Sequence, residues 1–114
     1  MWTIYHNPRC SKSRQTLQLL QDKGIDPEVV LYLETPPDRK TLAVLLQKLG
    51  IPARDLLRTG EDEYKALQLK DPGLGEEQLL DAMTQHPKLI QRPIVVKGDK
   101  AVLGRPPENV LELL

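Results

Sequence analysis

Apolar residues form short strand-like runs in some segments of the chain and recur at helical spacing in others, which predicts a mixed α/β protein. Four short apolar runs are typical of β-strands: residues 2–5, 28–33, 94–96 and 101–103. Between the second and third runs, apolar residues recur at helical spacing. The clearest stripe follows i, i+3, i+4, i+7 and stops at a glycine: Leu42, Leu45, Leu46, Leu49 and then Gly50.

Further helices fill most of the remaining chain. We expect them from the turn after the first strand to Lys23 with Gly24 as the C′ residue, over 53–59, over 61–69, over 76–86 before Pro87, and from Pro106 onward. Either Thr35 or Asp38 caps the leucine-striped helix at its N-terminus. The middle third is all helical and is typical of an insertion, at about 38–88, in a single domain spanning 1–114.

The order of these elements indicates a topology. A strand, a helix and a second strand in close succession predict a parallel unit with a right-handed crossover, and the run at 28–33 is apolar enough to be a central strand. The last two runs flank Gly98-Asp99, which suits a tight two-residue hairpin. The order β-α-β, helices, β-β-α matches a thioredoxin-like core with a four-stranded mixed sheet.

The only cysteine, Cys10, lies in the turn between the first strand and its helix. A helix N-terminus presents unpaired N–H groups, and Arg9, Lys12 and Arg14 add positive charge on both sides. Placement of this kind lowers a thiol pKa from about 8.5 to roughly 3.5–7.5. Free cysteines are more often small buried hydrophobes, but the polar flanks here favour an accessible, nucleophilic thiolate.

Three arginines are candidates for binding an anion near this cysteine: Arg58, Arg92 and Arg105. Arg92 and Arg105 each precede a proline, which restricts their backbone to extended conformations at opposite ends of the predicted hairpin. A guanidinium matches tetrahedral oxyanions through paired N–H donors and keeps its charge. From the pattern alone, three solvated surface charges are an equally good interpretation.

The segment His-Asn-Pro-Arg-Cys-Ser-Lys-Ser-Arg-Gln-Thr-Leu resembles the nucleophile loop of the glutaredoxin-coupled arsenate reductase family. Further segments match the family in order along nearly the whole chain: 32–37, 56–58, 86–96 and 104–108. The resemblance implies a thioredoxin-like fold, Cys10 as the nucleophile toward arsenate, and Arg58, Arg92 and Arg105 as oxyanion ligands. It also implies a cis peptide bond before Pro93, glutathione as co-substrate and glutaredoxin as the electron-donating partner.

Residues around Cys10 suggest how the thiolate is held. Ser13 could hydrogen-bond the thiolate or the oxyanion, His6 could stabilise the thiolate as imidazolium, and Asn7 could fix the shape of the loop. Each has an ordinary structural alternative, a first-turn helix residue for Ser13 and a strand-end residue for His6. Because no second cysteine stands at position 13, oxidised Cys10 needs an external thiol.

Composition excludes several other classes. The 16 basic residues balance the 16 acidic ones, so no global field attracts nucleic acid or an anionic membrane. No apolar run reaches the length of a membrane span and no signal-peptide pattern begins the chain, so we expect a cytoplasmic protein. We also expect a monomer. One cysteine and two histidines provide no zinc-ligand spacing. We expect neither a metal nor a bound cofactor.

Two alternatives to arsenate reduction stay open. The C-x-x-S spacing also suits a monothiol glutathione-dependent oxidoreductase, and the architecture suits a thioredoxin-like regulatory binding protein, which typically carries C-x-x-C as a switch. Arg9, Ser11 and Lys12 depart from the small residues common in the family loop and leave the natural substrate open. A low-molecular-weight phosphatase loop, C-x5-R, is absent because position 16 is Thr16.

Overall fold

The computed structural model describes residues 1–114 and divides them into two compact units, residues 1–35 with 92–114 and residues 36–91. The first unit contains β1 (Trp2–Tyr5), α1 (Ser11–Asp22), β2 (Glu28–Val30), β3 (Ile94–Lys97), β4 (Lys100–Leu103) and the 3-10 helix η2 (Pro107–Leu113). The second contains α2 (Arg39–Leu49), α3 (Ala53–Leu56), α4 (Asp62–Ala66), α5 (Glu76–Gln85) and the 3-10 helix η1 (Pro87–Leu89). No helix is both long enough and apolar enough to cross a membrane.

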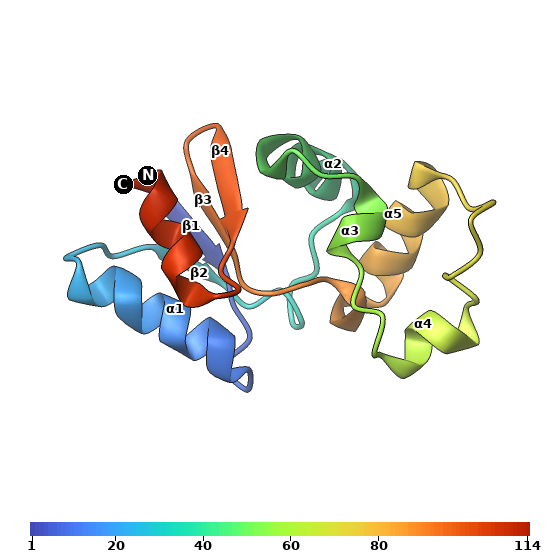
Figure 1. Ribbon diagram of the computed structural model, residues 1–114, viewed down its shortest axis with the longest axis horizontal. Helices are drawn as coiled ribbons and strands as arrows, with labels where there is room; N and C mark the ends of the chain where they lie inside the picture. The colour runs from blue at the N-terminus through green and yellow to red at the C-terminus, as the bar shows by residue number, and fades with distance from the viewer. The chain divides into compact units, whose positions relative to one another are not determined.

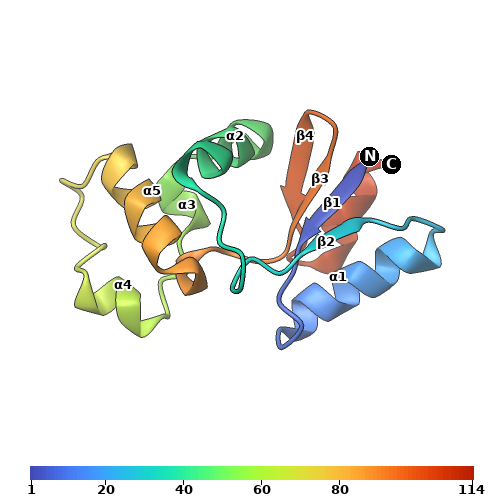
Figure 2. The same ribbon diagram turned by 180° about the vertical axis from the view of Figure 1, so that it is seen from behind.

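The predicted four-stranded mixed sheet is confirmed, with the strand order β2-β1-β3-β4. β1 runs parallel to β2 and antiparallel to β3, and β3 and β4 form the predicted hairpin around Gly98-Asp99. Gly98 has a φ of 62°, a conformation that a residue without Cβ adopts at little cost. The sheet is seen from two opposite sides in Figures 1 and 2.

The prediction for the second strand was wrong in two respects. β2 ends at Val30 rather than at residue 33, because the N–H groups of Glu34 and Thr35 both donate to the Leu31 carbonyl and turn the chain. β2 also lies at the edge of the sheet, not at its centre. The prediction assumed that the apolar residues of this strand are buried, but Val29 leaves 43% of its surface exposed.

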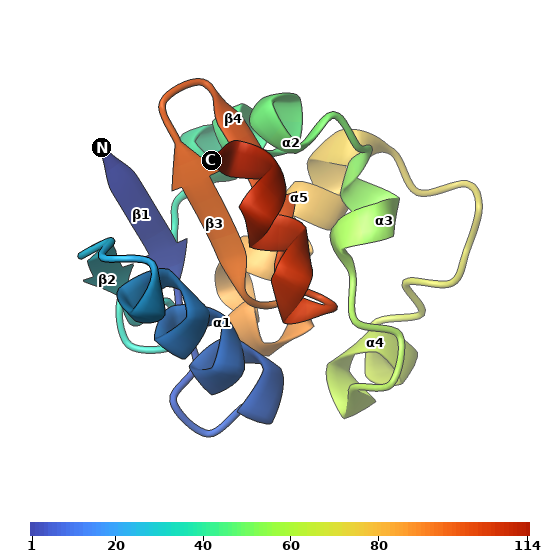
Figure 3. The same ribbon diagram turned by 60° about the vertical axis from the view of Figure 1, so that its left-hand side comes forward.

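Two helices cover one face of this sheet. α1 and η2 lie side by side on it in Figures 1 and 3. The core between helices and sheet is built from aliphatic residues of both: Ile4, Leu20, Val95, Val110 and Leu113. The last helix is a 3-10 helix that starts at Pro107, one residue later than predicted.

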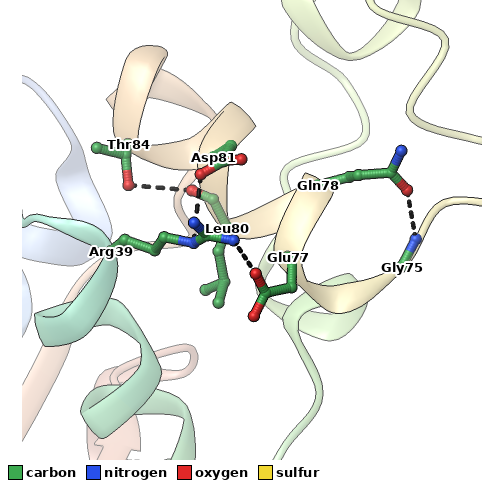
Figure 4. Close-up of polar contacts among 7 residues, drawn as sticks. All are labelled: Arg39, Gly75, Glu77, Gln78, Leu80, Asp81 and Thr84. Carbon is green, nitrogen blue, oxygen red and sulfur yellow. Dashed lines mark hydrogen bonds and ion pairs between the residues drawn. The ribbon is translucent and has the colours of Figure 1, made fainter.

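The helical unit is organised by α2 and α5. Asp38, not Thr35, caps α2: its carboxylate accepts the Thr41 N–H at 2.7 Å. The helix ends at Gly50, as predicted, with a left-handed φ of 71°. Arg39 at the start of α2 forms ion pairs with Glu77 and Asp81 of α5, the latter at 3.3 Å (Figure 4).

The two short helices of this unit are shorter than predicted. α3 ends at Leu56 because the chain then pairs with residues 89–91: the Arg58 N–H donates to the Leu89 carbonyl at 2.8 Å, and the Gln91 N–H to that of Leu56 at 2.9 Å. α4 keeps five residues, and Gln68, with a φ of 54°, turns the chain away from it. Residues on α3 therefore precede a β-bridge instead of a longer helix.

Candidate active site

Cys10 lies where the sequence predicted it, at the N-terminus of α1. It is the N-cap residue in an extended conformation, and its carbonyl accepts the Arg14 N–H at 3.0 Å as the first helical hydrogen bond. The Cys10 N–H donates to the Asn7 carbonyl at 3.0 Å, which closes a tight turn after β1. The side chain is partly exposed and forms no disulfide.

The environment of Cys10 favours the thiolate. Partial burial raises the pKa of the thiol, but the backbone N–H groups of Ser13 and Lys12 and the Arg92 guanidinium stabilise the charged form more strongly. The net result is a Cys10 pKa below its ordinary value. A thiolate held by helix N-terminal amides and a guanidinium is a nucleophile prepared for attack on an electrophilic centre.

Two of the three predicted arginines lie at this cysteine. Arg105 places Nη1 3.9 Å from Cys10 Sγ and 3.3 Å from the Arg92 carbonyl, to which it donates. Arg92 comes from the segment that leads into β3, and its Nε is buried without a hydrogen-bond acceptor. A buried donor without an acceptor is costly, and an incoming oxyanion would supply one.

Arg58 belongs to the helical unit, where its side chain is already engaged. Its Nε forms an ion pair with Glu61 at 3.3 Å, and its Nη1 lies 3.5 Å from Gln91 Oε1. The assignment of Arg58 to the oxyanion site therefore stays a prediction.

His6 and Ser13 contact each other rather than the sulfur with their side chains. His6 Nδ1 lies 2.6 Å from Ser13 Oγ, and the same oxygen accepts the Asn7 N–H at 3.0 Å. Burial, together with the nearby Arg14, lowers the pKa of His6, which disfavours the imidazolium that the sequence suggested. Ser13 reaches the thiolate through its backbone N–H, so these two residues support the loop that positions Cys10.

Asn7 fixes the loop, as the sequence suggested. Its Oδ1 accepts the Arg9 N–H at 3.0 Å, and the Arg14 guanidinium donates to the Pro8 carbonyl at 2.9 Å. The turn is thus held by side chains on both of its sides. Such bracing holds the turn that positions the sulfur.

A close packing contact behind the site was not predicted from the sequence. Thr16 is fully buried in α1, and its hydroxyl donates to the Lys12 carbonyl at 2.8 Å and lies 3.2 Å from that of Gly104. Gly104 in turn donates its N–H to the Pro93 carbonyl at 2.9 Å. A glycine directly before Arg105-Pro106 was the only sequence signal for this contact.

The cis peptide bond predicted between Arg92 and Pro93 is confirmed, and Arg105-Pro106 is cis as well. No group of three or more His, Cys, Asp or Glu side chains is arranged to hold a metal ion. At this end of the sheet, one cysteine lies beside two guanidinium groups.

A four-stranded mixed sheet, a cysteine in the turn between β1 and α1, and a cis-proline before β3 define a thioredoxin-like protein. A family model described as the ArsC family matches residues 5–113, and the chain belongs to that family.

Relatives of known name cover almost the same length. An uncharacterized protein, YfgD, of Escherichia coli K12 is 61% identical over 97% of this chain and 94% of its own length. A protein of Haemophilus influenzae named arsenate reductase is 50% identical, with 97% of each chain covered. The solved structure of an arsenate reductase from Vibrio cholerae superposes with a TM-score of 0.97 at 53% identity, covering 99% of this chain and 97% of that one.

Proposed function

We propose that this protein reduces arsenate to arsenite with Cys10 as the nucleophile and glutathione as the source of electrons. The observation that carries the proposal is the pair of guanidiniums at the Cys10 sulfur, one lowering its pKa and one 3.9 Å away. Relatives named arsenate reductase at about half identity support the choice of oxyanion.

The proposed cycle begins when the Cys10 thiolate attacks As(V): a sulfur–arsenic bond forms, and one arsenate oxygen takes up a proton from solvent and leaves as water. The thiolate of glutathione then attacks the Cys10 sulfur; a disulfide forms, and the electron pair of the sulfur–arsenic bond stays with arsenic, which leaves as arsenite. A glutaredoxin thiol finally removes the glutathionyl group and restores Cys10.

The positive side chains have distinct tasks in this scheme. Arg92 stabilises the thiolate before attack and offers its unpaired Nε to the oxyanion. Arg105 lies close enough to the sulfur to bind an oxygen of the arsenic group attached to it. Both act by electrostatic stabilisation, which is strongest where donors are fixed in advance.

The test is arsenate-dependent oxidation of NADPH in the presence of glutathione, glutaredoxin and glutathione reductase. Turnover is expected with the parent chain and not with Cys10→Ser. Mass spectrometry after acid quenching should also find one glutathione attached to the parent chain. If neither turnover nor a glutathione adduct were observed with the parent chain, the proposal would be overturned.

A second candidate, a monothiol glutathione-dependent oxidoreductase, rests on Ser13. Its hydroxyl stands at the position of a resolving thiol and is held by His6 and Asn7. An adduct that forms with simple disulfides but never with arsenate would favour this second function.

A further inference from the structure

A groove beside the Cys10 loop is the feature of the first unit that arsenate chemistry leaves unused. Residues 6–9 form one wall, and Leu31, Leu33 and Glu34, from the turn after β2, form the other. The groove has a volume of about 380 Å³. This lies within the roughly 300–1,000 Å³ typical of small-molecule sites.

Both walls are fixed by hydrogen bonds. The 6–9 wall is braced by Asn7 and Arg14 as described above, and the other by the turn in which Glu34 and Thr35 donate to the Leu31 carbonyl at 3.0 and 2.9 Å. The His6 N–H donates to the Val30 carbonyl at 2.9 Å and joins the two walls. A ligand entering this groove would cost little ordering of the protein.

The lining has a definite chemical character. Leu31 and Leu33 each leave 37% of their surface exposed and make their wall largely apolar. Arg9 and Glu34 are exposed on opposite walls, and neither side chain makes an ion pair or hydrogen bond within the protein. Two free and opposite charges flanking apolar surface suit a small molecule that carries both a carboxylate and an ammonium group on a short peptide stem.

We propose that this groove binds the glutathione whose sulfur becomes joined to Cys10. The ammonium of its γ-glutamyl end pairs with Glu34, a carboxylate pairs with Arg9, and the peptide stem lies on Leu31 and Leu33. Because Arg9 is bonded to Cys10, this orientation directs the sulfur in the middle of the tripeptide toward the nucleophile. The inference rests on the proposed function for its choice of thiol, and it adds where that thiol binds.

A reaction without arsenate tests the groove separately. In thiol–disulfide exchange, the Cys10 thiolate attacks one sulfur of glutathione disulfide; a mixed disulfide forms and one glutathione thiolate leaves, with no net gain or loss of electrons. Stopped-flow kinetics can compare this rate with the rate for N-acetylated glutathione disulfide, which lacks the ammonium groups. Failure of arsenate turnover would leave this measurement intact.

The decisive variant is Glu34→Gln, because general electrostatics and the groove predict opposite signs. Glutathione disulfide is net negative, so removal of a nearby carboxylate should speed its approach if no specific site exists. If Glu34 holds the ammonium, the rate should fall about two- to fivefold, the range expected for a solvent-exposed ion pair. The N-acetylated disulfide should show no such fall.

Matched controls are available on the same surface. Glu28→Gln removes a carboxylate from β2 that does not line the groove, and Lys12→Gln removes a cation on the other side of Cys10. Arg9→Gln should slow the reaction with glutathione disulfide two- to fivefold, whereas Glu28→Gln and Lys12→Gln should leave the preference for the non-acetylated disulfide unchanged. Equal slowing of the reaction with glutathione disulfide by Arg9→Gln and Lys12→Gln would overturn the proposal.

A binding measurement closes the test. Amide resonances of Cys10→Ser protein titrated with S-methylglutathione should shift at Arg9, Leu31 and Glu34. No shift, or shifts confined to the Arg92-Pro93 segment, would overturn the assignment of glutathione to this groove. A parent chain that reacts equally fast with bis(2-hydroxyethyl) disulfide and glutathione disulfide would do the same.

Discussion

Gly104→Ala is a single added methyl group whose effect can be worked out from the packing behind the active site. An alanine Cβ at this position would lie 2.7 Å from Thr16 Oγ1, 2.8 Å from Pro93 Cγ and 2.9 Å from Thr16 Cγ2. Relaxed carbon contacts are about 3.5–4.0 Å. Because α1 and the segment before β3 crowd the methyl group together, the backbone between β4 and Arg105 must shift.

Overpacking of this kind costs about 1–3 kcal/mol. An unfolding entropy of about 2.1 cal/mol/K per residue gives a chain of 114 residues about 0.24 kcal/mol/K. The melting temperature should therefore fall by about 4–12 °C. Since Gly104 directly precedes Arg105, the same shift should move that guanidinium from Cys10 and slow arsenate turnover.

Differential scanning calorimetry measures the first effect, with Gly60→Ala as the matched control. No atom lies within 4 Å of the corresponding Cβ at Gly60, so that variant should stay within about 0.5 kcal/mol of the parent. Thr16→Ala combined with Gly104→Ala should destabilise less than the sum of the two single changes, because it removes two of the three short contacts. A Gly104→Ala chain that melts within about 2 °C of the parent would refute the packing argument.

Three other perturbations address the site itself. Iodoacetamide labelling of Cys10 should titrate below the free thiol value of about 8.5; a midpoint at that value would contradict the lowered pKa. Arg92→Ala should raise this midpoint. Arg92→Lys should restore it only in part, because an ammonium keeps the charge but loses the planar fork. An unchanged midpoint in Arg92→Ala would show that Arg92 does not lower the pKa of Cys10. The folded-state pKa of His6 lies below its ordinary 6.5, so the unfolded chain binds the proton first. The contribution of His6 to the free energy of unfolding should be complete above about pH 6.5 and should fall as the pH drops toward the folded pKa. Urea melts of His6→Asn should show a shallower fall of the free energy of unfolding with pH. Equal slopes for the parent and the variant would contradict this.

Local signals in the sequence were sufficient for much of the fold. The leucine stripe ended by Gly50, the hairpin turn at Gly98-Asp99 and the helix that begins after Cys10 each depend on residues close together in the chain. Whether β2 is central or at the edge depends instead on which strands pair, and β1 pairs with both β2 and the distant β3. An apolar run cannot distinguish a strand at the centre of a sheet from one at its exposed edge.

The active-site residues also divide into those that local sequence predicts and those that depend on tertiary packing. Cys10 could be predicted because its flanking residues alone make a core position unfavourable. The choice of hydrogen-bond partners could not: Arg105 approaches a cysteine 95 positions earlier, whereas Arg58 pairs with Glu61 only three positions later. Both are arginines outside regular helices and strands, and only tertiary packing determines which acceptor each one meets.

Ser13 occupies the position of a resolving thiol and therefore bears on how Cys10 is reduced in the proposed cycle. Its hydroxyl is fully buried and bonded on two sides, to the His6 ring and the Asn7 backbone, so the position that could carry a second thiol instead supports the loop. A sulfur there would be larger and a weaker hydrogen-bond partner, and it would loosen the turn that places Cys10 at the helix N-terminus. A loop built in this way positions the Cys10 thiolate well but contains no second thiol to reduce it. In the proposed cycle the reducing thiol must then arrive from solvent, and the charged groove one residue from Cys10 is where we propose that it binds.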